Sequence, residues 1–232
     1  MYWKFIATIF LLPAAAWADI GCVTDTLANY EALGPGGCTI KGLPFSNFSF
    51  SKVFASGGAV PVTAAQITVT PVDPEIAAGL NFGSTGFSVS PGQAVQYRLE
   101  LEVDDPPIIH GWDLRLFDPV MPPADITITS EECLGAAFVG LVCPTSSIIT
   151  NTVSDNGITA VLDDTESFAP VGTVGELTTI TLDATAGGSA SFTSFTESAI
   201  LQTPEPSSAI LLAPCGALLL LLARRRLLRK AG

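Results

Sequence analysis

The feature that most constrains the fold is a strict alternation of apolar and polar side chains along residues 95–103. Five apolar residues share one parity, and the residues between them are polar or charged: Val95, Tyr97, Leu99, Leu101 and Val103. Because successive side chains of a strand point to opposite faces, this pattern predicts a strand with one buried and one wetted face. Shorter runs of the same kind occur at residues 67–69, 87–89, 112–116, 126–128, 158–162 and 177–182.

Residues that favour turns separate these runs. Asn156-Gly157, flanked by apolar alternation, predicts a tight hairpin. Within residues 177–182 the alternation slips by one position, which predicts a β-bulge. Residues 26–33 form one helical pattern, with Leu27 and Tyr30 on one face. The sequence therefore predicts an all-β ectodomain over residues 19–202, an antiparallel β-sandwich of Ig-like or jelly-roll-like type.

The N-terminus has the order of a secretory signal peptide. Lys4 supplies a positive charge, residues 5–12 are apolar, and Ala16 and Ala18 give the small-x-small pattern before Asp19. The alternative is an N-terminal membrane anchor, but eight apolar residues are too few to cross a bilayer core, which takes about 20. We expect residues 1–18 to be removed by cleavage before Asp19.

The C-terminus combines three features in a fixed order: a proline-rich tract, the uncharged residues 209–223 and a basic cluster. The tract contains Pro204, Glu205 and Pro206. The basic cluster consists of Arg224, Arg225, Arg226, Arg229 and Lys230. A helix over about residues 207–224 would just span a membrane, with the basic tail 224–230 on the cytoplasmic side and the body outside. A core helix of a soluble domain is the alternative, disfavoured because residues 218–222 are apolar on every face.

This arrangement over residues 203–232 resembles the PEP-CTERM sorting domain. The resemblance implies that the chain is a substrate of an exosortase, a membrane-embedded cysteine transpeptidase that recognises the Pro-Glu-Pro motif. It also implies export by a Gram-negative bacterium, transient anchoring in the inner membrane through the C-terminal helix, with the basic cluster stopping translocation, and later transfer to the cell surface or to an exopolysaccharide or biofilm matrix. Residues 22–58 resemble, more loosely, an ectodomain of such proteins that has no assigned activity.

Five cysteines divide by compartment. Cys215 lies in the expected membrane segment, whereas Cys22, Cys38, Cys133 and Cys143 lie in the exported body, where an even number of cysteines usually means disulfides. Four cysteines allow three connectivities, and we favour Cys22–Cys38 with Cys133–Cys143 because each pair closes a local, glycine-containing loop. Zinc binding is the alternative, but the chain has one histidine and no Cys-x-x-Cys. We expect no cofactor and no metal ligands among these cysteines.

No arrangement of residues predicts a catalytic centre. His110 is the only histidine, which leaves one imidazole for any general base, and no Gly-x-Ser-x-Gly motif occurs. Carboxylates cluster at Asp104-Asp105, Glu131-Glu132 and residues 163–166. Adjacent strand residues face opposite sides, so this clustering does not place two carboxylates in one cleft. A calcium ion, which accepts loop carboxylates without a fixed motif, is an alternative to a solvated acidic surface.

The charge of the body limits its partners. Residues 19–203 hold 21 acidic and four basic residues, a net charge of −17 at pH 7, which excludes a nucleic-acid partner. The leading hypothesis is a non-enzymatic exported surface or matrix protein. The second is a carbohydrate- or surface-binding, adhesin-like module, which an exposed aromatic platform built on Trp112 would favour. The third is a secreted hydrolase, which would need two carboxylates in one cleft.

Overall fold

The computed structural model describes residues 20–74, 77–119 and 124–201. The expected signal peptide, with its cleavage site, and the expected sorting segment both lie outside the described residues. The strands have these bounds: β1 Asp25–Thr26, β2 Cys38–Ile40, β3 Leu43–Ser56, β4 Thr68–Val72, β5 Ala77–Gly83, β6 Ser88–Val89, β7 Ala94–Phe117, β8 Asp125–Leu134, β9 Ile148–Asp155, β10 Ala160–Val161, β11 Asp163–Asp183, β12 Ala190–Ser191 and β13 Ser194–Leu201. The helices are α1 Leu27–Ala32 and the 3₁₀ turns η1 Gly34–Gly36 and η2 Ala64–Gln66. No helix in these ranges is long and apolar enough to cross a membrane.

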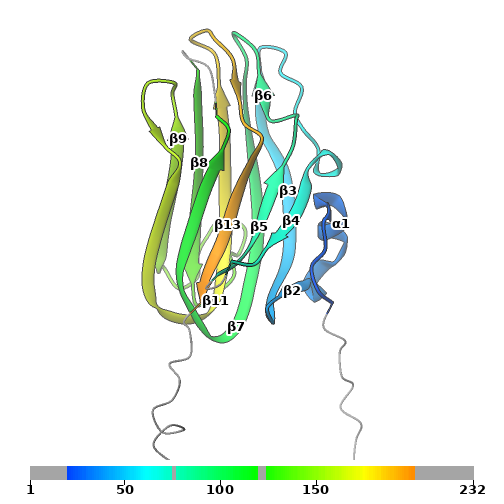
Figure 1. Ribbon diagram of the computed structural model, residues 1–232, viewed down its shortest axis with the longest axis vertical. Coiled ribbons are helices and arrows are strands. Elements are labelled where there is room, and N and C mark those ends of the chain that lie inside the picture. The colour runs from blue at the N-terminus through cyan, green and yellow to red at the C-terminus, as the bar shows by residue number, and fades with distance from the viewer. Residues whose placement is uncertain (1–19, 75–76, 120–123, 202–232) are drawn as a thin grey trace, which may run out of the picture.

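Two long strands, β7 and β11, organise the fold because each bends once and continues in a second layer (Figure 1). The first half of β7 pairs with β3 and with the second half of β11, and its second half pairs with β13 and with the first half of β11. The β7–β11 register breaks where Val171 faces Ile109 and Thr173 faces Asp104. Pro106 and Pro107 fall in this break, and prolines have no N–H to donate to a ladder.

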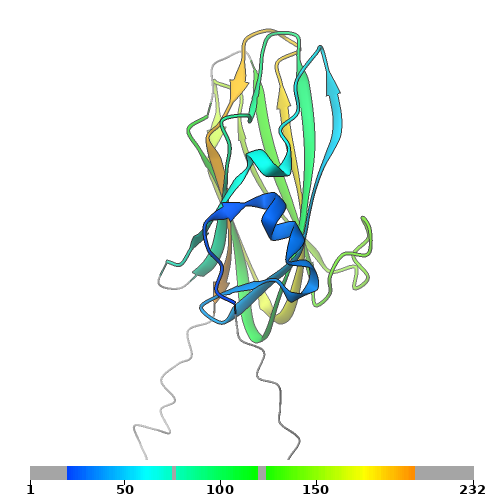
Figure 2. The ribbon, with the colours of Figure 1, turned by 90° about the vertical axis from the view of Figure 1, so that its right-hand side faces the viewer.

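The sheet thereby curls into two facing layers. The first layer contains β3, β7 (94–103), β11 (173–183), β8 and β9, and the second contains β4, β5, β13, β7 (109–117) and β11 (163–171). All pairs between these named strands are antiparallel, which confirms the predicted antiparallel β fold. The helix α1 and the strand β2 lie beside β3 at the end of the molecule where β7 bends (Figures 1 and 2).

The predicted alternation is confirmed, because the five apolar residues of 95–103 are all buried between the layers. One half of the interior, which we call the aromatic half, is filled by five rings: Phe82, Phe87, Tyr97, Phe192 and Phe195. Phe87 stacks on Phe192 with ring centroids 4.6 Å apart, and Phe82 stacks on Phe195 at 5.1 Å. Burial of each such ring contributes about 1.5–3 kcal/mol, so this half accounts for much of the stability.

The bulge predicted within residues 177–182 is wrong. β11 pairs with both β7 and β8 in unbroken register from Val174 to Asp183. Leu177 lies on the outer face, and Glu176 and Thr178 occupy the inner positions on either side of it. The slip of the alternation is therefore only apparent, because polar residues occupy inner positions of the strand. The register does not change.

The local predictions are confirmed. Helix α1 carries Leu27 and Tyr30 on its buried face, and the Thr26 hydroxyl caps it by accepting a hydrogen bond from the backbone N–H of Asn29 (3.4 Å). The Asn156-Gly157 turn joins β9 to β10, and Gly157 has a φ of 72°, a left-handed conformation that favours glycine.

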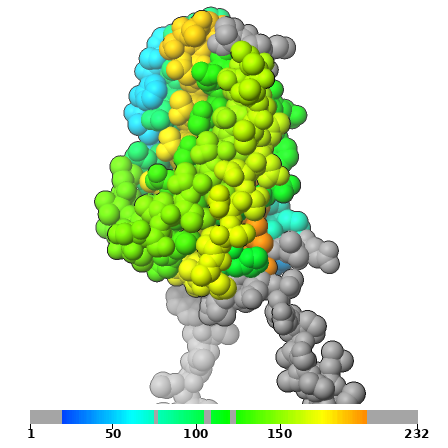
Figure 3. Space-filling model, turned by 90° about the vertical axis from the view of Figure 1, so that its left-hand side faces the viewer, coloured from blue at the N-terminus to red at the C-terminus, as the bar shows by residue number. Residues whose placement is uncertain are grey.

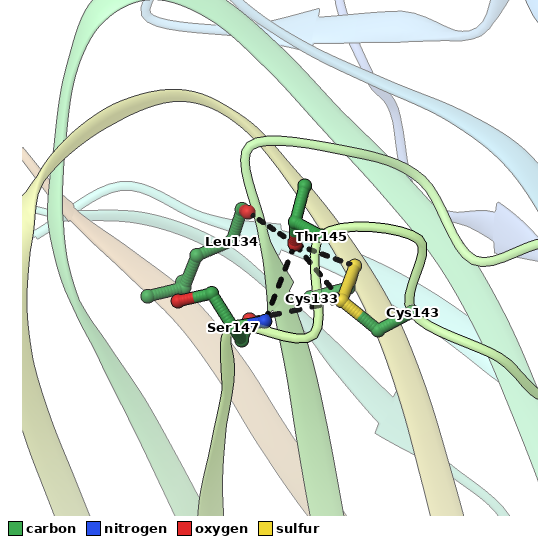
Figure 4. Close-up of a disulfide and its surroundings, with 5 residues drawn as sticks. All are labelled: Cys133, Leu134, Cys143, Thr145 and Ser147. Atoms are coloured by element: carbon green, nitrogen blue, oxygen red, sulfur yellow. Dashed lines mark hydrogen bonds between the residues drawn. A yellow bond between two sulfur atoms is a disulfide. The ribbon is translucent and has the colours of Figure 1, made fainter.

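Both favoured disulfides are present, Cys22–Cys38 and Cys133–Cys143. Figure 4 shows the second, at the base of the loop that joins β8 to β9. Beside it the Thr145 hydroxyl donates a hydrogen bond to the carbonyl of Leu134 (2.9 Å), which ties the two ends of the loop together. Each disulfide closes a short, local loop, as the spacing predicted.

Candidate functional site

A groove of about 360 Å³ lies on the outer face of the second layer, and we call it the Arg115 groove. Its lining residues come from β4, β5, β7, β11 and β13 and, for Pro74, from the segment that follows β4: Val72, Pro74, Ala77, Asp113, Arg115, Phe117, Thr165, Thr196, Ser198 and Ile200. The polar side chains form the floor because they are the outward-facing residues of three adjacent strands, in which Arg115 lies opposite Thr196 and Asp113 opposite Ser198 and Thr165. The apolar side chains form the walls.

The polar groups of the Arg115 groove hold one another in fixed positions. The Arg115 Nε donates to Asp113 Oδ2 (2.7 Å) and lies 3.4 Å from Asp163 Oδ2, while the Thr165 hydroxyl donates to Asp113 Oδ1 (2.7 Å). The hydrogen bond that Arg115 donates to Asp113 raises the pKa of Arg115, so the guanidinium stays charged. The groove therefore presents oriented donors and acceptors beside apolar walls, which suits a ligand rich in hydroxyl groups.

Gly79 keeps the floor of the Arg115 groove flat. A Cβ atom at this position would lie 2.2 Å from the Glu197 carbonyl oxygen and 2.4 Å from Ser198 Oγ on the paired strand β13. No side chain fits at that separation, so only glycine allows β5 and β13 to meet beneath the groove.

A second groove, of about 450 Å³, lies on the outer face of the first layer. Four threonines of two paired strands make its centre, with Thr127 opposite Thr181 and Thr129 opposite Thr179, and we call it the threonine groove. Polar side chains of β7 continue the floor, where the Gln96 amide donates to the Thr181 hydroxyl (3.1 Å).

Leu141, from the loop of residues 135–147, closes one side of the threonine groove. The loop protrudes from the body (light green in Figure 3), and its apolar tip is solvent-exposed: Val139 by 71%, Leu141 by 55% and Val142 by 67%. Besides the disulfide at its base, two backbone hydrogen bonds join Val139 to Val142 and fix the shape of the tip. The groove therefore has a polar floor and one braced apolar wall.

Three glutamates from three strands meet in the interior, between the two layers. Glu132 of β8 is 0% exposed, Glu176 of β11 is 1% exposed and Glu197 of β13 is 2% exposed. With the buried Ser130 and Thr178 they form what we call the acid cluster. Thr178 Oγ1 lies 2.6 Å from Glu197 Oε1, a contact that joins the first layer to the second.

Burial changes the acidity of the cluster. Burial raises the pKa of Glu132 to about 9, against the opposing effect of the Ser130 hydrogen bond. Burial, followed by the neighbouring Glu197 charge, raises the pKa of Glu176 well above its ordinary value, and burial also raises the pKa of Glu197. A charged carboxylate in an apolar interior loses its hydration, so the neutral acid is favoured at neutral pH.

The structure places the remaining sequence candidates apart from one another. His110 lies half-buried in β7, just after the bend. Trp112 is fully buried, because an inward position of β7 hides the ring between the layers, so it does not form the exposed platform that would favour a binding module. As predicted for adjacent strand residues, Glu131 faces the outer groove while Glu132 faces the interior. No group of three His, Cys, Asp or Glu side chains in the described ranges is arranged to hold a metal ion.

Sequence reasoning missed Glu176 and Glu197. Both occupy inward positions of strands whose other inward residues are apolar. This strand parity was the signal from which their burial could have been predicted. The contact between these two side chains could not be predicted from the sequence, because β11 and β13 come together only through the bends of the long strands.

Comparisons with known proteins add little to this description. No protein-family model matches the chain, and no curated protein matches its sequence. Among solved structures, the chain is similar to the carbohydrate-binding module TmCBM61, solved in complex with β-1,4-galactotriose. The two share 12% identity with a TM-score of 0.34, over 66% of this chain and 88% of that module.

Proposed function

We propose that this chain is an exported surface or matrix protein whose β-sandwich body has no catalytic activity of its own. The observation that carries the proposal is the pair of disulfides, since disulfides form and persist in exported proteins. The net charge of −17 on residues 19–203 supports a soluble body outside the cell. In this proposal, the N-terminal signal peptide directs export and the C-terminal helix holds the protein in the inner membrane until an exosortase-like enzyme processes it.

The intact mass of the protein, recovered from the membrane and from the medium of its host, tests this proposal. We expect loss of residues 1–18 and of the chain beyond Pro204-Glu205-Pro206. Added mass at the new end would identify the acceptor molecule, and exopolysaccharide is the one that the resemblance implies. A chain that still ends at residue 232 and occurs only in membranes would contradict processing.

A second candidate function, carbohydrate binding, is favoured by the Arg115 groove. Its Arg115–Asp113 pair and the Thr165, Thr196 and Ser198 side chains offer donors and acceptors in fixed positions. Phe117, 41% exposed at the wall, offers an apolar ring to the C–H face of a sugar. Because the body is strongly acidic, the ligand in this proposal is a neutral polysaccharide.

Calorimetric titration of the mature protein with neutral and with uronate-containing oligosaccharides tests carbohydrate binding. We expect binding of neutral sugars, and a loss of about tenfold or more in affinity for Arg115→Ala, because a charge-assisted hydrogen bond contributes roughly 1.5–3 kcal/mol. Arg98→Ala, which alters the threonine groove, is the matched control. Equal affinity of the two variants would place the binding site elsewhere.

A further inference from the structure

We propose that Glu132, Glu176 and Glu197 are held as uncharged acids in the folded protein and form a hydrogen-bonded latch that joins the two layers and loosens as pH rises. The three side chains come from β8, β11 and β13 and are almost completely buried. Ser130 and Thr178 lie between them, so the network runs from β8 across β11 to β13 of the opposite layer. This inference does not depend on the proposed function.

Counting hydrogens supports the uncharged state. Ser130 Oγ contacts Glu132 Oε1 at 2.6 Å and Glu176 Oε1 at 3.3 Å, and Thr178 Oγ1 contacts Glu176 Oε1 at 3.0 Å and Glu197 Oε1 at 2.6 Å. Each contact between two oxygens needs one hydrogen, and each hydroxyl carries only one. The two hydroxyls serve two of these four contacts, and protonated carboxyls must supply the hydrogens of the other two.

The buried atoms without hydrogen-bond partners around the latch also support the uncharged state. The Oε2 atoms of all three glutamates are buried without a hydrogen-bond partner, as is Oδ1 of Asn151, which is fully buried directly opposite Ser130 on the inner face. All four are acceptors, and in the part of the chain that the structure describes the buried side-chain donors without a partner are Trp112 Nε1 and Arg98 Nε. An ionised carboxylate would leave a charged oxygen without a partner, at far greater cost than the neutral oxygen of a protonated acid.

Among residues 20–74, 77–119 and 124–201, no lysine or arginine side chain compensates for the glutamates. Lys41 and Lys52 are exposed, whereas Arg98 and Arg115 line the outer grooves. The charges that act on the latch are those of the glutamates on one another and of Asp164 on β11, and all of these are negative. The side chains that β5 and β7 place next to Glu197 in register are Leu80 and Leu114, and β9 contributes the neutral Asn151.

A bound cation would be the other way to stabilise three buried carboxyl groups. The described side chains include no group of three acidic, His or Cys residues arranged to ligate a metal ion. We therefore propose that protons on the carboxyl groups, and not a cation, stabilise the cluster. The experiment described below would also detect a bound cation.

The sign of the pH effect follows from linkage. The folded protein keeps protons that the unfolded chain releases above a pKa of about 4.5, so stability is highest below that pH and falls as pH rises. For Glu132 the fall continues up to its folded pKa of about 9. Each carboxyl that stays protonated makes the unfolding constant rise about tenfold per pH unit in this window.

The test is urea unfolding of the full chain at pH values from 5 to 8, for the wild type and for Glu132→Gln. Glutamine keeps the shape of a neutral glutamic acid but cannot lose a proton. We expect Glu132→Gln to reduce the pH dependence of the unfolding constant by about tenfold per pH unit. Glu131→Gln, one residue away on the outer face, is the matched control and should match the wild type. Equal pH dependence of Glu132→Gln and the wild type would overturn the proposal.

Infrared spectroscopy of the wild-type chain at pH 7 gives a second readout that needs no variant to fold. A protonated-carboxyl C=O band supports the latch, and its absence overturns it. Calcium chloride and EDTA are tested in the same unfolding series. Stabilisation by calcium at neutral pH that Glu132→Gln abolishes would replace the protons by a bound cation and would also overturn the latch.

Discussion

The interior of this protein has two unlike halves that share the same strands. In β13, Phe195 belongs to the aromatic half, and Glu197, two residues later on the same inner face, belongs to the acid cluster. The aromatic half is held by ring contacts such as Phe82–Phe195. The acid cluster is held by hydrogen bonds through Thr178. One continuous interior can therefore combine a half whose contribution to stability does not depend on pH with a half whose contribution does.

Truncation in the aromatic half should have the largest effect. Phe195→Ala removes a fully buried ring that packs against Phe82 and Phe87, so we expect a loss of about 3–5 kcal/mol in the free energy of unfolding. Urea unfolding at pH 5 and pH 8 measures the loss, which should be equal at the two pH values. A loss that changes with pH would show that the two halves are coupled, and that the contribution of the aromatic half to stability does depend on pH.

Removal of the hydroxyl between the layers should have the next largest effect. Thr178→Val keeps the shape of the side chain but leaves Glu176 and Glu197 without their shared partner. We expect a loss of about 1–3 kcal/mol at pH 5, measured by the same unfolding experiment. Thr179→Val, on the outer face of the same strand, is the control and should change stability by less than about 0.5 kcal/mol.

Replacement of both partners should make the stability of the acid cluster less dependent on pH. In the double variant Thr178→Val/Glu197→Met, an apolar pair takes the place of the hydrogen bond between the layers. We expect a smaller loss at pH 5 than for Thr178→Val alone, because Glu197 no longer leaves a buried carboxyl unsatisfied and Glu176 keeps its contact with Ser130. At pH 8 we expect the double variant to be more stable than the wild type, since one raised pKa no longer opposes folding. Lower stability at both pH values would show that the network itself is required.

The smallest effect on stability is expected on the surface, where a carboxylate does have a cation beside it. Arg115→Ala removes the partner of Asp113 and Asp163 from a half-exposed position. We expect a loss of at most about 1 kcal/mol, smaller at high salt, measured by thermal unfolding at low and high ionic strength. A larger, salt-independent loss would mean that Asp113 behaves as a buried charge and belongs with the acid cluster.

Much of the fold could be predicted from short stretches of sequence. The alternation along residues 95–103, the helical pattern of residues 26–33, the Asn156-Gly157 turn and the two cysteine pairs all depend on neighbours within about 20 residues. Such local patterns are set by backbone geometry and by loop length, so they need no knowledge of the rest of the chain. The bulge predicted within residues 177–182 failed because a polar residue on an inner face looks like a change of phase.

Strand alternation and cysteine spacing are enough to predict an antiparallel β body with two disulfides. The positions of the polar side chains in that body depend on how the strands fold together. Glu132, Glu176 and Glu197 are separated by more than 20 residues from one another, and they meet because β7 and β11 bend and bring two layers face to face. The same bends place Arg115 and the threonines on opposite outer faces, where the two grooves form. Strand parity decides which face a side chain takes, but only the curl of the sheet decides which side chains it meets there.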